Sequence, residues 1–455
     1  MSSTTCTVLV SQQFVNTVTL SRELAKTLKI SPTKTITVRL GSKSVTVPLK
    51  IMNRKGSVCS LPQSVASMLK LPWTGSCQIR STNGDDIQLG PLVGVLASNT
   101  SDMQQPFGSL TPFVRDFMRA GTNKAFYYAF SPQQVNWSEG VVTGLIPDEE
   151  GGWKRKTLPL PDVVYNRLSS RKAEKTISME SFKDKFVRRK IPLFNWSFFD
   201  KWDVYRLLEG EDASKYVPES IIDPTPEEIK KMMEKHRFVF LKPTNGSLGI
   251  GIYRLTYNPD KGYFARFRKN GSNTLIRFPR FEGLMKMLYR HNIRLQSYVL
   301  QQGIRLIEID SCPIDFRFHM TKNGMNEWVP TGIGAKKAGR GSVTTHVRTG
   351  GQLLTPEHVL NQLFGHRADQ VLEHAKEVAI QLAEAIERRY PHPLGELGFD
   401  IGIDLNESVW MFEANAKPGR SIFKHPSLKA QGKASISNLV DHCLYLSRFR
   451  VRREG

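Results

Sequence analysis

The chain has 455 residues, enough for about two to four domains and a large core. Its 64 lysines and arginines against 42 aspartates and glutamates give a formal charge of +22, which favours an anionic partner such as a nucleotide, an acidic peptide, a polyanion or nucleic acid. No apolar run approaches the roughly 20 residues that span a membrane, which argues against an integral membrane protein.

The cysteine spacing and the N-terminus point to a reducing compartment. Five cysteines lie far apart in the sequence without a CxxC pair, which argues against a zinc site or a disulfide framework. The N-terminus lacks the basic start and long apolar core of a signal peptide. We therefore expect a soluble, cytoplasmic protein.

The first segment, residues 1–98, is predicted to be a β-rich, barrel-like domain. Residues 35–49, "TITVRLGSKSVTVPL", alternate apolar and polar on both sides of Gly41-Ser42, which indicates a hairpin. A short helix and hairpin recur about 41 residues later. This duplication suggests a pseudo-symmetric barrel, although the similarity is low enough to arise by chance. We interpret the domain as an interaction or packing module.

Residues 99–190 change to an α/β pattern with a strong basic excess. "FVRDFMRAGTNKAFYYAF" predicts a helix leading into a strand, and "LPLPDVVYNRL" a strand that ends in a polar turn. Residues 151–190 hold twelve Lys/Arg against four Asp/Glu. A solvated basic face explains this as well as an anion-binding surface does. Few aromatic residues interleave with the charge, so nucleic-acid stacking is poorly supported.

The stretch "FVFLKPTNGSLGIGIYRL" (238–255) predicts a strand, a glycine-rich turn and a second strand. Phosphate-binding loops of the P-loop and Rossmann type lead into a helix, and the P-loop lysine follows its glycines. Here Lys242 precedes the glycines and a strand follows them. The segment is either a flexible hairpin that covers phosphates or an ordinary tight hairpin.

The remaining elements alternate between helices and hairpins. Residues 191–210 start extended and become helical, and 273–300 predict a helix and a strand. The long periodic stretch over about 355–389, with Pro356 at its start, is predicted to be helical. The pattern predicts an α+β protein with mainly antiparallel sheets.

The hairpin formed by "GFDIGIDL" and "VWMFEANA", around Asn406-Glu407, holds the strongest chemical signal. Symmetric pairing places Asp400 opposite Glu413, roughly 5 Å apart, with Asn415 on the same face. Gly398 and Gly402 are expected to leave this face open. Two facing carboxylates repel unless a cation or a proton intervenes, and with an amide oxygen they suit Mg²⁺ or Mn²⁺. The alternative is that one carboxylate pairs with a neighbouring lysine or arginine.

This combination of a lysine, a glycine hairpin and a D–x₁₂–E–x–N hairpin resembles the ATP-grasp superfamily over about residues 190–420. The resemblance implies an ATP-grasp fold, in which two α+β lobes clamp ATP, preceded by a pre-ATP-grasp α/β domain over 99–190. The implied ATP-grasp domain is 191–455, with a nucleotide-binding lobe over 191–294 and a metal-binding lobe over 295–455. "LQSYV" (295–299) resembles the linker between the two lobes. The implied activity is Mg²⁺-dependent, ADP-forming ligation of a carboxylate to an amine through an acyl phosphate.

The resemblance also implies roles for individual residues. Arg317 would steady the γ-phosphate or the acyl phosphate, and Asp400, Glu413 and Asn415 would bind the metal. Alternatively, Lys201 is a solvated helix lysine and Arg317 is a partner of Asp315. The residues that the resemblance assigns to ATP are Lys201, Lys242, Gly246, Ser247, Gly249, Gly251, Gln296, Tyr298 and Val299, with Lys242 also catalytic and with backbone atoms of Tyr298 and Val299 contacting adenine.

Finer motifs such as "LPLPDVVYNR", "TTHVRTGG" and "ELGFDIGID" resemble the endospore coat-associated YheC/YheD family. The sequence departs from common ATP-grasp patterns at Gln296-Ser297, where an acid contacting adenine is frequent, at Lys336-Lys337, where an arginine is common, and at His346, where an asparagine is usual. The last two departures concern the acceptor site more than the ATP site.

Two hypotheses for the function remain at this point. One is a ligase acting on an acidic peptide or a spore component, and the other is an assembly protein of the spore coat that keeps the fold, with or without ATP. Candidates for gripping an anionic substrate are Arg167, Arg420 and Lys424. Expected partners are ATP, a carboxylate substrate and spore-coat proteins or a paralogue, whereas membrane binding is not expected and nucleic acid ranks third.

Overall fold

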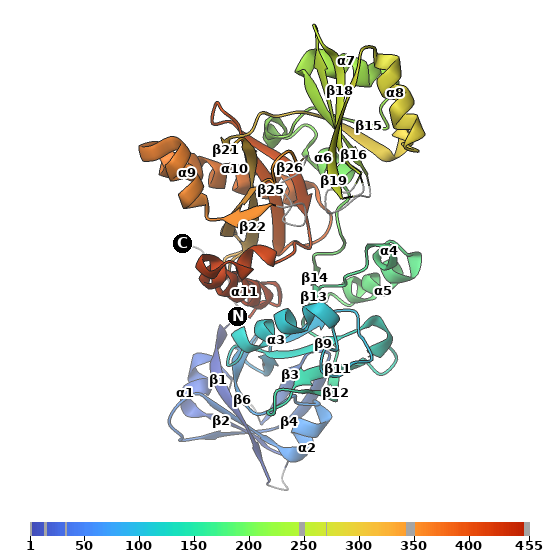
Figure 1. The fold of residues 1–455 in the computed structure, drawn as a ribbon. Helices are drawn as coiled ribbons and strands as arrows, with labels where there is room; N and C mark the ends of the chain where they lie inside the picture. The colour runs from blue at the N-terminus through green and yellow to red at the C-terminus, as the bar shows by residue number, and fades with distance from the viewer. Residues whose placement is uncertain are drawn as a thin grey trace.

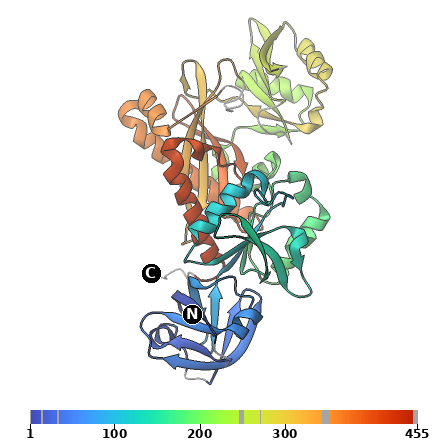
Figure 2. The same cartoon turned by 60° about the horizontal axis from the view of Figure 1, so that its bottom comes forward.

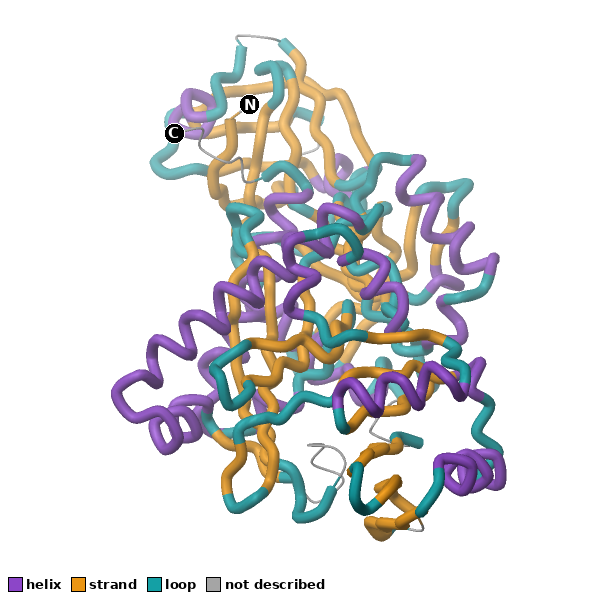
Figure 3. Tube along the Cα trace, turned by 90° about the horizontal axis from the view of Figure 1, so that it is seen from above, coloured by secondary structure: helices purple, strands orange, loops and turns teal. Residues whose placement is uncertain are grey.

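The computed structural model describes residues 2–12, 16–31, 34–244, 251–269, 271–342 and 351–449. The chain passes from a barrel at one end of the molecule, through a middle domain, to two lobes at the other end (Figures 1 and 2). Figure 3 shows the barrel to be mostly strand, whereas the long helices lie in the rest of the molecule.

The N-terminal barrel closes in the strand order β1-β5-β2-β4-β3-β7-β6. Its two helices begin 41 residues apart, and each is followed by a hairpin, so the repeat seen in the sequence is a structural repeat. Cys6 and Cys77 face each other across β1 and β6, and all five cysteines are buried and free. The elements are β1 (Ser2–Ser11), β2 (Val18–Ser21), α1 (Arg22–Thr27), β3 (Thr35–Leu40), β4 (Lys43–Met52), β5 (Val58–Pro62), α2 (Gln63–Met68), β6 (Gly75–Ser81) and β7 (Asp86–Gly90).

The middle domain has a mixed sheet in the order β10-β11-β9-β8-β13-β14, with β12 paired to β11. Its first and last strands lie outside the predicted range of 99–190, because the apolar runs at both edges of that range pair with the sheet. The elements are β8 (Leu92–Leu96), α3 (Thr111–Ala120), β9 (Phe126–Phe130), β10 (Val135–Asn136), β11 (Val141–Pro147), β12 (Trp153–Pro159), β13 (Val163–Asn166), α4 (Arg171–Glu174), α5 (Ile177–Arg188) and β14 (Leu193–Phe194).

The distal lobe is an antiparallel sheet in the order β15-β20-β16-β17-β18-β19, covered by α7 and α8 (Figure 1). Thr225 caps α7 by accepting from Glu228 N–H, and Pro226 occupies the first helical position, where no N–H is needed. The elements are α6 (Lys201–Leu208), which leads into the lobe, β15 (Ser220–Ile222), α7 (Pro226–His236), β16 (Phe238–Pro243), β17 (Tyr253–Asn258), β18 (Gly262–Lys269), β19 (Ser272–Phe278), α8 (Phe281–Arg290) and β20 (Tyr298–Gln302).

The large lobe is a second antiparallel sheet, in the order β24-β23-β22-β25-β26 with β21 paired to β22. The stretch over about 355–389 is helical as predicted, but Gly365, with φ +54° and ψ −121°, separates α9 from α10. The elements are β21 (Glu308–Ile309), β22 (Cys312–Lys322), β23 (Trp328–Lys337), β24 (Gln352–Leu354), α9 (Pro356–Phe364), α10 (Ala368–Arg389), β25 (Glu396–Ile403), β26 (Val409–Asn415) and α11 (Lys429–Leu446).

Apolar cores tie three of these four parts together. The barrel and the middle sheet share one core, and α11 returns from the large lobe to pack its buried face on the middle domain beside α3. The distal lobe instead has a core drawn only from residues 229–300. The distal lobe is therefore the part with the fewest buried apolar ties to the rest.

Candidate functional site

The hairpin of β25 and β26 brings the predicted metal-binding residues together. Asp400 pairs with Glu413, and Gly398 pairs with Asn415, so the predicted cross-strand pairing is confirmed. A register shift after Asp400 moves the pairing by one residue, and Gly402 then faces Trp410. The hairpin is therefore not symmetric about Asn406-Glu407 as predicted, because a bulge separates the turn from the paired carboxylates.

The two glycines beside Asp400 do not leave the face open, contrary to the prediction. A Cβ atom at Gly398 would lie 2.5 Å from Pro418 Cβ and 3.0 Å from Arg317 Nη1, and one at Gly402 would lie 2.4 Å from Leu306 Cδ2. Neighbouring side chains thus pack directly over both glycines. The missing Cβ at Gly398 provides the space in which the Arg317 guanidinium lies.

Two cations flank the Asp400 carboxylate. Arg317 Nε lies 3.1 Å and Lys336 Nζ 3.0 Å from Asp400 Oδ1, and Lys336 Nζ also lies 2.9 Å from Asp315 Oδ1. Burial alone would lower the pKa of Lys336, but the two carboxylates outweigh it and the pKa is raised. The alternative reading, a carboxylate paired with neighbouring cations, therefore describes Asp400, and the acidic partner of Arg317 is Asp400 instead of Asp315.

Lys242 ends strand β16 at the border between the two lobes. Its Nζ donates to Gln301 Oε1 and lies 5.6 Å from the centre of the Phe412 ring of β26. Gln301 Nε2 in turn lies 2.5 Å from the hydroxyl of Tyr205 on α6. Burial raises the pKa of Tyr205 to about 12, and the charge of Glu413 adds to the rise, while hydrogen bonds to Ser220 and Gln301 oppose it. Lys242 is thus close to the hairpin that holds Glu413.

Gln301 and Tyr205 were not found from the sequence. Gln301 is only 1% exposed. The one sequence feature that could have pointed to it is a polar amide at the end of an apolar strand. Tyr205 follows Lys201 by four residues, which places both on one face of α6. Neither signal was specific enough to predict a contact with Lys242.

The structure describes only part of the segments that are predicted to contact ATP. Strands β16 and β17 pair through Leu241 and Tyr253, so the predicted strand–turn–strand arrangement is confirmed for its strands. Gly251 has φ +75°, which favours glycine. Lys201 opens α6, where Asp200 accepts from Asp203 N–H at 2.8 Å. The Lys201 side chain, Gly246, Ser247, Gly249 and His346 lie outside the described residues.

The segment predicted to link the lobes belongs to the distal sheet. Gln296 lies in a short 3₁₀ turn, and Tyr298 and Val299 begin β20, which has a neighbouring strand on each side. The Tyr298 carbonyl accepts from Asp223 N–H at 3.0 Å. The predicted lobe boundary at 294/295 therefore lies too early: the chain leaves this sheet after Gln302, because the apolar stretch at 298–300 is a strand.

Arg167, predicted to grip a substrate, is only 6% exposed and holds the middle domain to the large lobe. Its Nη1 pairs with Glu396 Oε1, and the Tyr165 hydroxyl lies 2.5 Å from the same oxygen. Burial raises the pKa of Glu396, but Arg167 together with His319 and Arg420 outweighs burial and brings the pKa to about 2. Arg167 is therefore engaged internally, which contradicts its predicted exposure to substrate.

Arg420 is also engaged internally, whereas Lys424 is exposed. Arg420 donates to His319 Nε2 at 3.2 Å and to the Gly432 carbonyl of α11 at 3.0 Å. His319 Nε2 also lies 3.5 Å from Glu396 Oε2. Burial lowers the pKa of His319 to about 4, which fits a neutral ring. The prediction that Arg420 grips substrate is thus not supported by its contacts.

Lys417 follows Asn415 by two residues and was missed by the sequence analysis. It is buried, and its Nζ lies 2.5 Å from Glu174 Oε1 of α4. Burial lowers the pKa of Lys417 to about 7, while the charge of Glu174 opposes the shift. This ion pair joins the loop after the hairpin of β25 and β26 to the middle domain.

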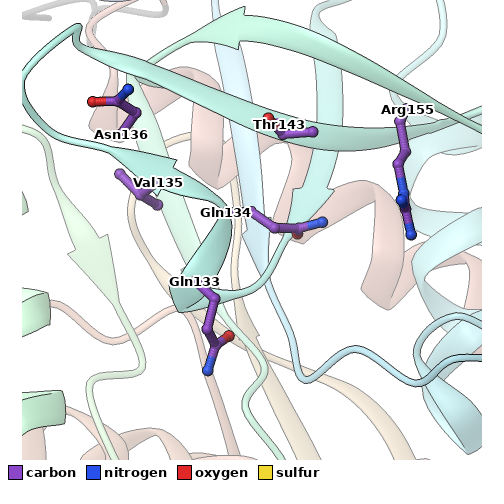
Figure 4. A pocket seen from close by; sticks show the side chains of 6 residues that line it. All are labelled: Gln133, Gln134, Val135, Asn136, Thr143 and Arg155. Atoms are coloured by element: carbon purple, nitrogen blue, oxygen red, sulfur yellow. The ribbon is translucent and has the colours of Figure 1, made fainter.

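A polar groove of about 420 Å³ lies on the middle domain at β10, β11 and β12 (Figure 4). None of the predicted site residues lines it. The groove is lined by Gln133, Gln134, Val135, Asn136, Thr143 and Arg155.

Comparison with known proteins identifies the family. A model of the YheC/D-like ATP-grasp domain matches residues 190–446. The chain is 34% identical over 368 residues to the endospore coat-associated protein YheD of Bacillus subtilis (strain 168), which covers 79% of this chain and 80% of that protein. The chain belongs to the YheC/D-like ATP-grasp family. The predicted family and the predicted α+β ATP-grasp fold are confirmed.

Other similar proteins are more distant. The endospore coat-associated protein YheC of the same strain is 24% identical over 280 residues, covering 59% of this chain and 73% of YheC. The D-Ala:D-Ser ligase VanG of Enterococcus faecalis is 13% identical, with a TM-score of 0.43, covering 79% of this chain and 99% of that one. None of the described helices of our ATP-grasp protein is both long and apolar enough to cross a membrane.

Proposed function

We propose that this ATP-grasp protein is an ADP-forming ligase that joins a carboxylate to an amine through an acyl phosphate. The observation that supports it best is the position of Lys242, which lies beside Phe412 of the hairpin on which Asp400 faces Glu413. Family membership supplies the second support, since the ATP-grasp model covers both segments.

The residues of the hairpin fit a hard divalent cation. Asp400 and Glu413 present carboxylates on one face, and Gly398 pairs with Asn415 next to them. Among the described residues no three Asp, Glu, His or Cys side chains gather as a metal site, so the Asn415 amide oxygen would be the third ligand. Bound Mg²⁺ or Mn²⁺ would offset the charge on the phosphate oxygens of ATP.

In this proposal cationic side chains stabilise the transferring phosphoryl group. Lys242 and Lys201 neutralise phosphate oxygens, and the loop from Gly246 to Gly251 covers them. Arg317 and Lys336, held near the reaction centre by Asp400, stabilise negative charge as it moves. Backbone atoms near Tyr298 and Val299, with Gln296 at the edge, stay the predicted adenine contacts, and Lys424 stays a predicted substrate contact.

The reaction has two steps. A carboxylate oxygen of the substrate attacks the γ-phosphorus of ATP, the bond to the β,γ-bridging oxygen breaks, and ADP leaves with that electron pair. The amine nitrogen then attacks the acyl carbon, phosphate leaves, and the amine loses a proton. No side chain of the protein forms a covalent bond, because the substrate carboxylate is the nucleophile.

The test is ADP release in a screen of carboxylates paired with amines, followed by transfer of ¹⁸O from a labelled carboxylate. We expect one ¹⁸O atom in the released phosphate, and we expect Glu413→Ala to abolish both signals. ADP release that occurs without ¹⁸O in the phosphate would contradict the acyl phosphate and indicate simple hydrolysis.

A second candidate is a non-catalytic assembly protein. Two observations favour it: the curated relatives are named endospore coat-associated proteins, and cations of the protein already satisfy Asp400. This candidate predicts that Glu413→Ala leaves incorporation into the spore coat unchanged, measured by extraction of the coat fraction and immunoblotting.

A further inference from the structure

Helices α4 and α5 present an exposed basic face that neither the fold nor the ATP site explains. They lie together at one edge of the molecule, beside the junction of the middle domain and the distal lobe (Figures 1 and 2). We define the basic face by its seven exposed cations. They are Arg171, Lys172, Lys175, Lys185, Arg188, Arg189 and Lys190.

The acidic residues of these helices do little to neutralise the basic face. Glu174 is buried and pairs with Lys417 of the large lobe. Glu180 pairs with the buried Lys183 at 2.8 Å and accepts from Trp196 Nε1 at 2.8 Å. Asp184, the third acid of these helices, is half-buried and stands against seven exposed cations. The charge that faces solvent is therefore strongly positive and attracts anions.

The aromatic side chains around the face offer no surface on which nucleic-acid bases can stack. Arg189 and Lys185 lie over the Trp137 ring at 4.9 and 5.5 Å from its centre, and Phe186 is fully buried. Single-stranded nucleic acids depend on exposed aromatic rings for much of their affinity. The face therefore suits a chain of carboxylates better than a chain of nucleotides.

The basic face is continuous with the proposed active site through α4. Arg171 Nη1 donates to the Phe199 carbonyl at 2.8 Å, and Lys175 Nζ lies 3.9 Å from Asp200, the residue that caps α6. On its other side α4 reaches the loop after Asn415 through the ion pair of Glu174 with Lys417. An anionic chain on this face would thus end between α6 and the metal-binding hairpin.

We propose that the basic face of α4 and α5 binds an acidic polypeptide, which supplies the carboxylate that the ATP site activates. The role of this polypeptide as the carboxylate substrate rests on the proposed function. The binding itself needs only the charges of the basic face. A carboxylate-rich chain would place several acidic side chains on the cations while one carboxylate reaches the ATP site.

The test is binding of fluorescent poly-L-glutamate, about 20 residues long, to the full chain by fluorescence anisotropy. We expect binding that weakens between about 50 and 200 mM salt, and a loss of about 10-fold or more in the variant K185E/R188E/K190E. The matched control reverses three exposed lysines of α7 and α8, K230E/K231E/K286E, and should bind within about two-fold of wild type.

Three outcomes would overturn the proposal. They are no binding of poly-L-glutamate, an equal loss in the control variant, and binding of single-stranded DNA of the same charge that is as tight as that of the polypeptide. Thermal stabilisation by Mg·ATP, measured on the same proteins, keeps this result separate from the proposed function. The triple variant should retain that stabilisation, whereas Glu413→Ala should lose it and still bind poly-L-glutamate.

Discussion

Asp400 lies between the cations of its own sheet and the carboxylate that faces it across the hairpin. Arg317 and Lys336 reduce the repulsion between the two acids. The same cations would be available to phosphate oxygens once a divalent cation neutralises Asp400. One cluster can therefore serve both the fold and the proposed chemistry.

Asp400→Asn should lower the free energy of unfolding by about 1–3 kcal/mol, because Lys336 and Arg317 lose a charged partner in a place with little solvent. The measurement is urea unfolding followed by circular dichroism. Asp310→Asn is the matched control, because it removes the acid of another Asp–Lys pair of this sheet, whose carboxylate is 78% exposed. Its loss should stay below about 1 kcal/mol. Equal losses would show that Asp400 has no structural role.

Arg167→Met should cost about 3–5 kcal/mol at neutral pH, because it leaves the Glu396 carboxylate buried without a cation. In wild type the pKa of Glu396 lies near 2, below its usual 4.5, so its stabilisation is present above pH 4.5 and lost as the pH falls towards 2. In the variant burial raises this pKa, and protonation near pH 5 relieves part of the cost.

The check on Arg167→Met is urea unfolding at pH 7.5 and at pH 5. The loss relative to wild type should be smaller at pH 5. Lys124→Met breaks an ion pair with Asp441 whose side chains are 40% and 22% exposed, and it should cost less than about 1 kcal/mol at both pH values. An identical loss for Arg167→Met at both pH values would contradict the assigned charge of Glu396.

These residues differ in how far the sequence could predict them. Asp400 and Glu413 sit on one hairpin, where strand alternation and a short turn decide which residues face each other. Arg167 and Glu396 are 229 residues apart, and the ion pair depends on how two domains pack. A basic residue after a strand looked like a substrate contact, because sequence spacing holds no information about that packing.

At the scale of elements, the break between α9 and α10 follows from a single backbone conformation. Apolar residues keep helical spacing on both sides of Gly365, which is why the sequence predicted a helical stretch without marking the break. Gly365 adopts φ +54° and ψ −121°, a conformation that residues with a Cβ atom rarely adopt. Strand β20 was mistaken for a linker because a short apolar run does not show which strands it will pair with.

Gly365→Ala should destabilise the protein by about 1–3 kcal/mol through backbone strain alone, since a Cβ there would have no atom within 4 Å. Gly283→Ala is the matched control, because Gly283 lies inside α8 and its Cβ would make an ordinary 3.4 Å contact with Phe278. That change should stabilise by about 0.5–1 kcal/mol. Thermal unfolding should show a lower melting temperature for Gly365→Ala and a higher one for Gly283→Ala. An unchanged melting temperature in Gly365→Ala would contradict the backbone strain.

At the scale of the whole molecule, the distal lobe is tied to the remainder less firmly than the other parts are tied to one another. Its core is its own, whereas α11 and the Arg167–Glu396 and Lys417–Glu174 ion pairs join the large lobe to the middle domain. The order of the domains was readable from changes in sequence pattern. The return of α11 to the middle domain was not, because no local signal marks it.

Amide hydrogen exchange should therefore be faster in the core strands of the distal lobe than in the middle sheet, because a lobe with a separate core opens at a lower free energy. Mg·ATP should slow exchange in β16 and β20 and leave the barrel unchanged. Mass spectrometry of peptic fragments measures these exchange rates with and without Mg·ATP. Equal protection of the distal lobe and the middle sheet, with no effect of nucleotide, would contradict this division.

The most direct test of the central claim, that the hairpin of Asp400 and Glu413 holds Mg·ATP, is thermal unfolding with ATP, GTP and ADP, each with and without Mg²⁺. Wild type and Glu407→Ala, at the turn of the same hairpin, should be stabilised by ATP only when Mg²⁺ is present. Glu413→Ala should lose this rise. No shift of the wild type with any nucleotide, or an equal shift in Glu413→Ala, would contradict the account.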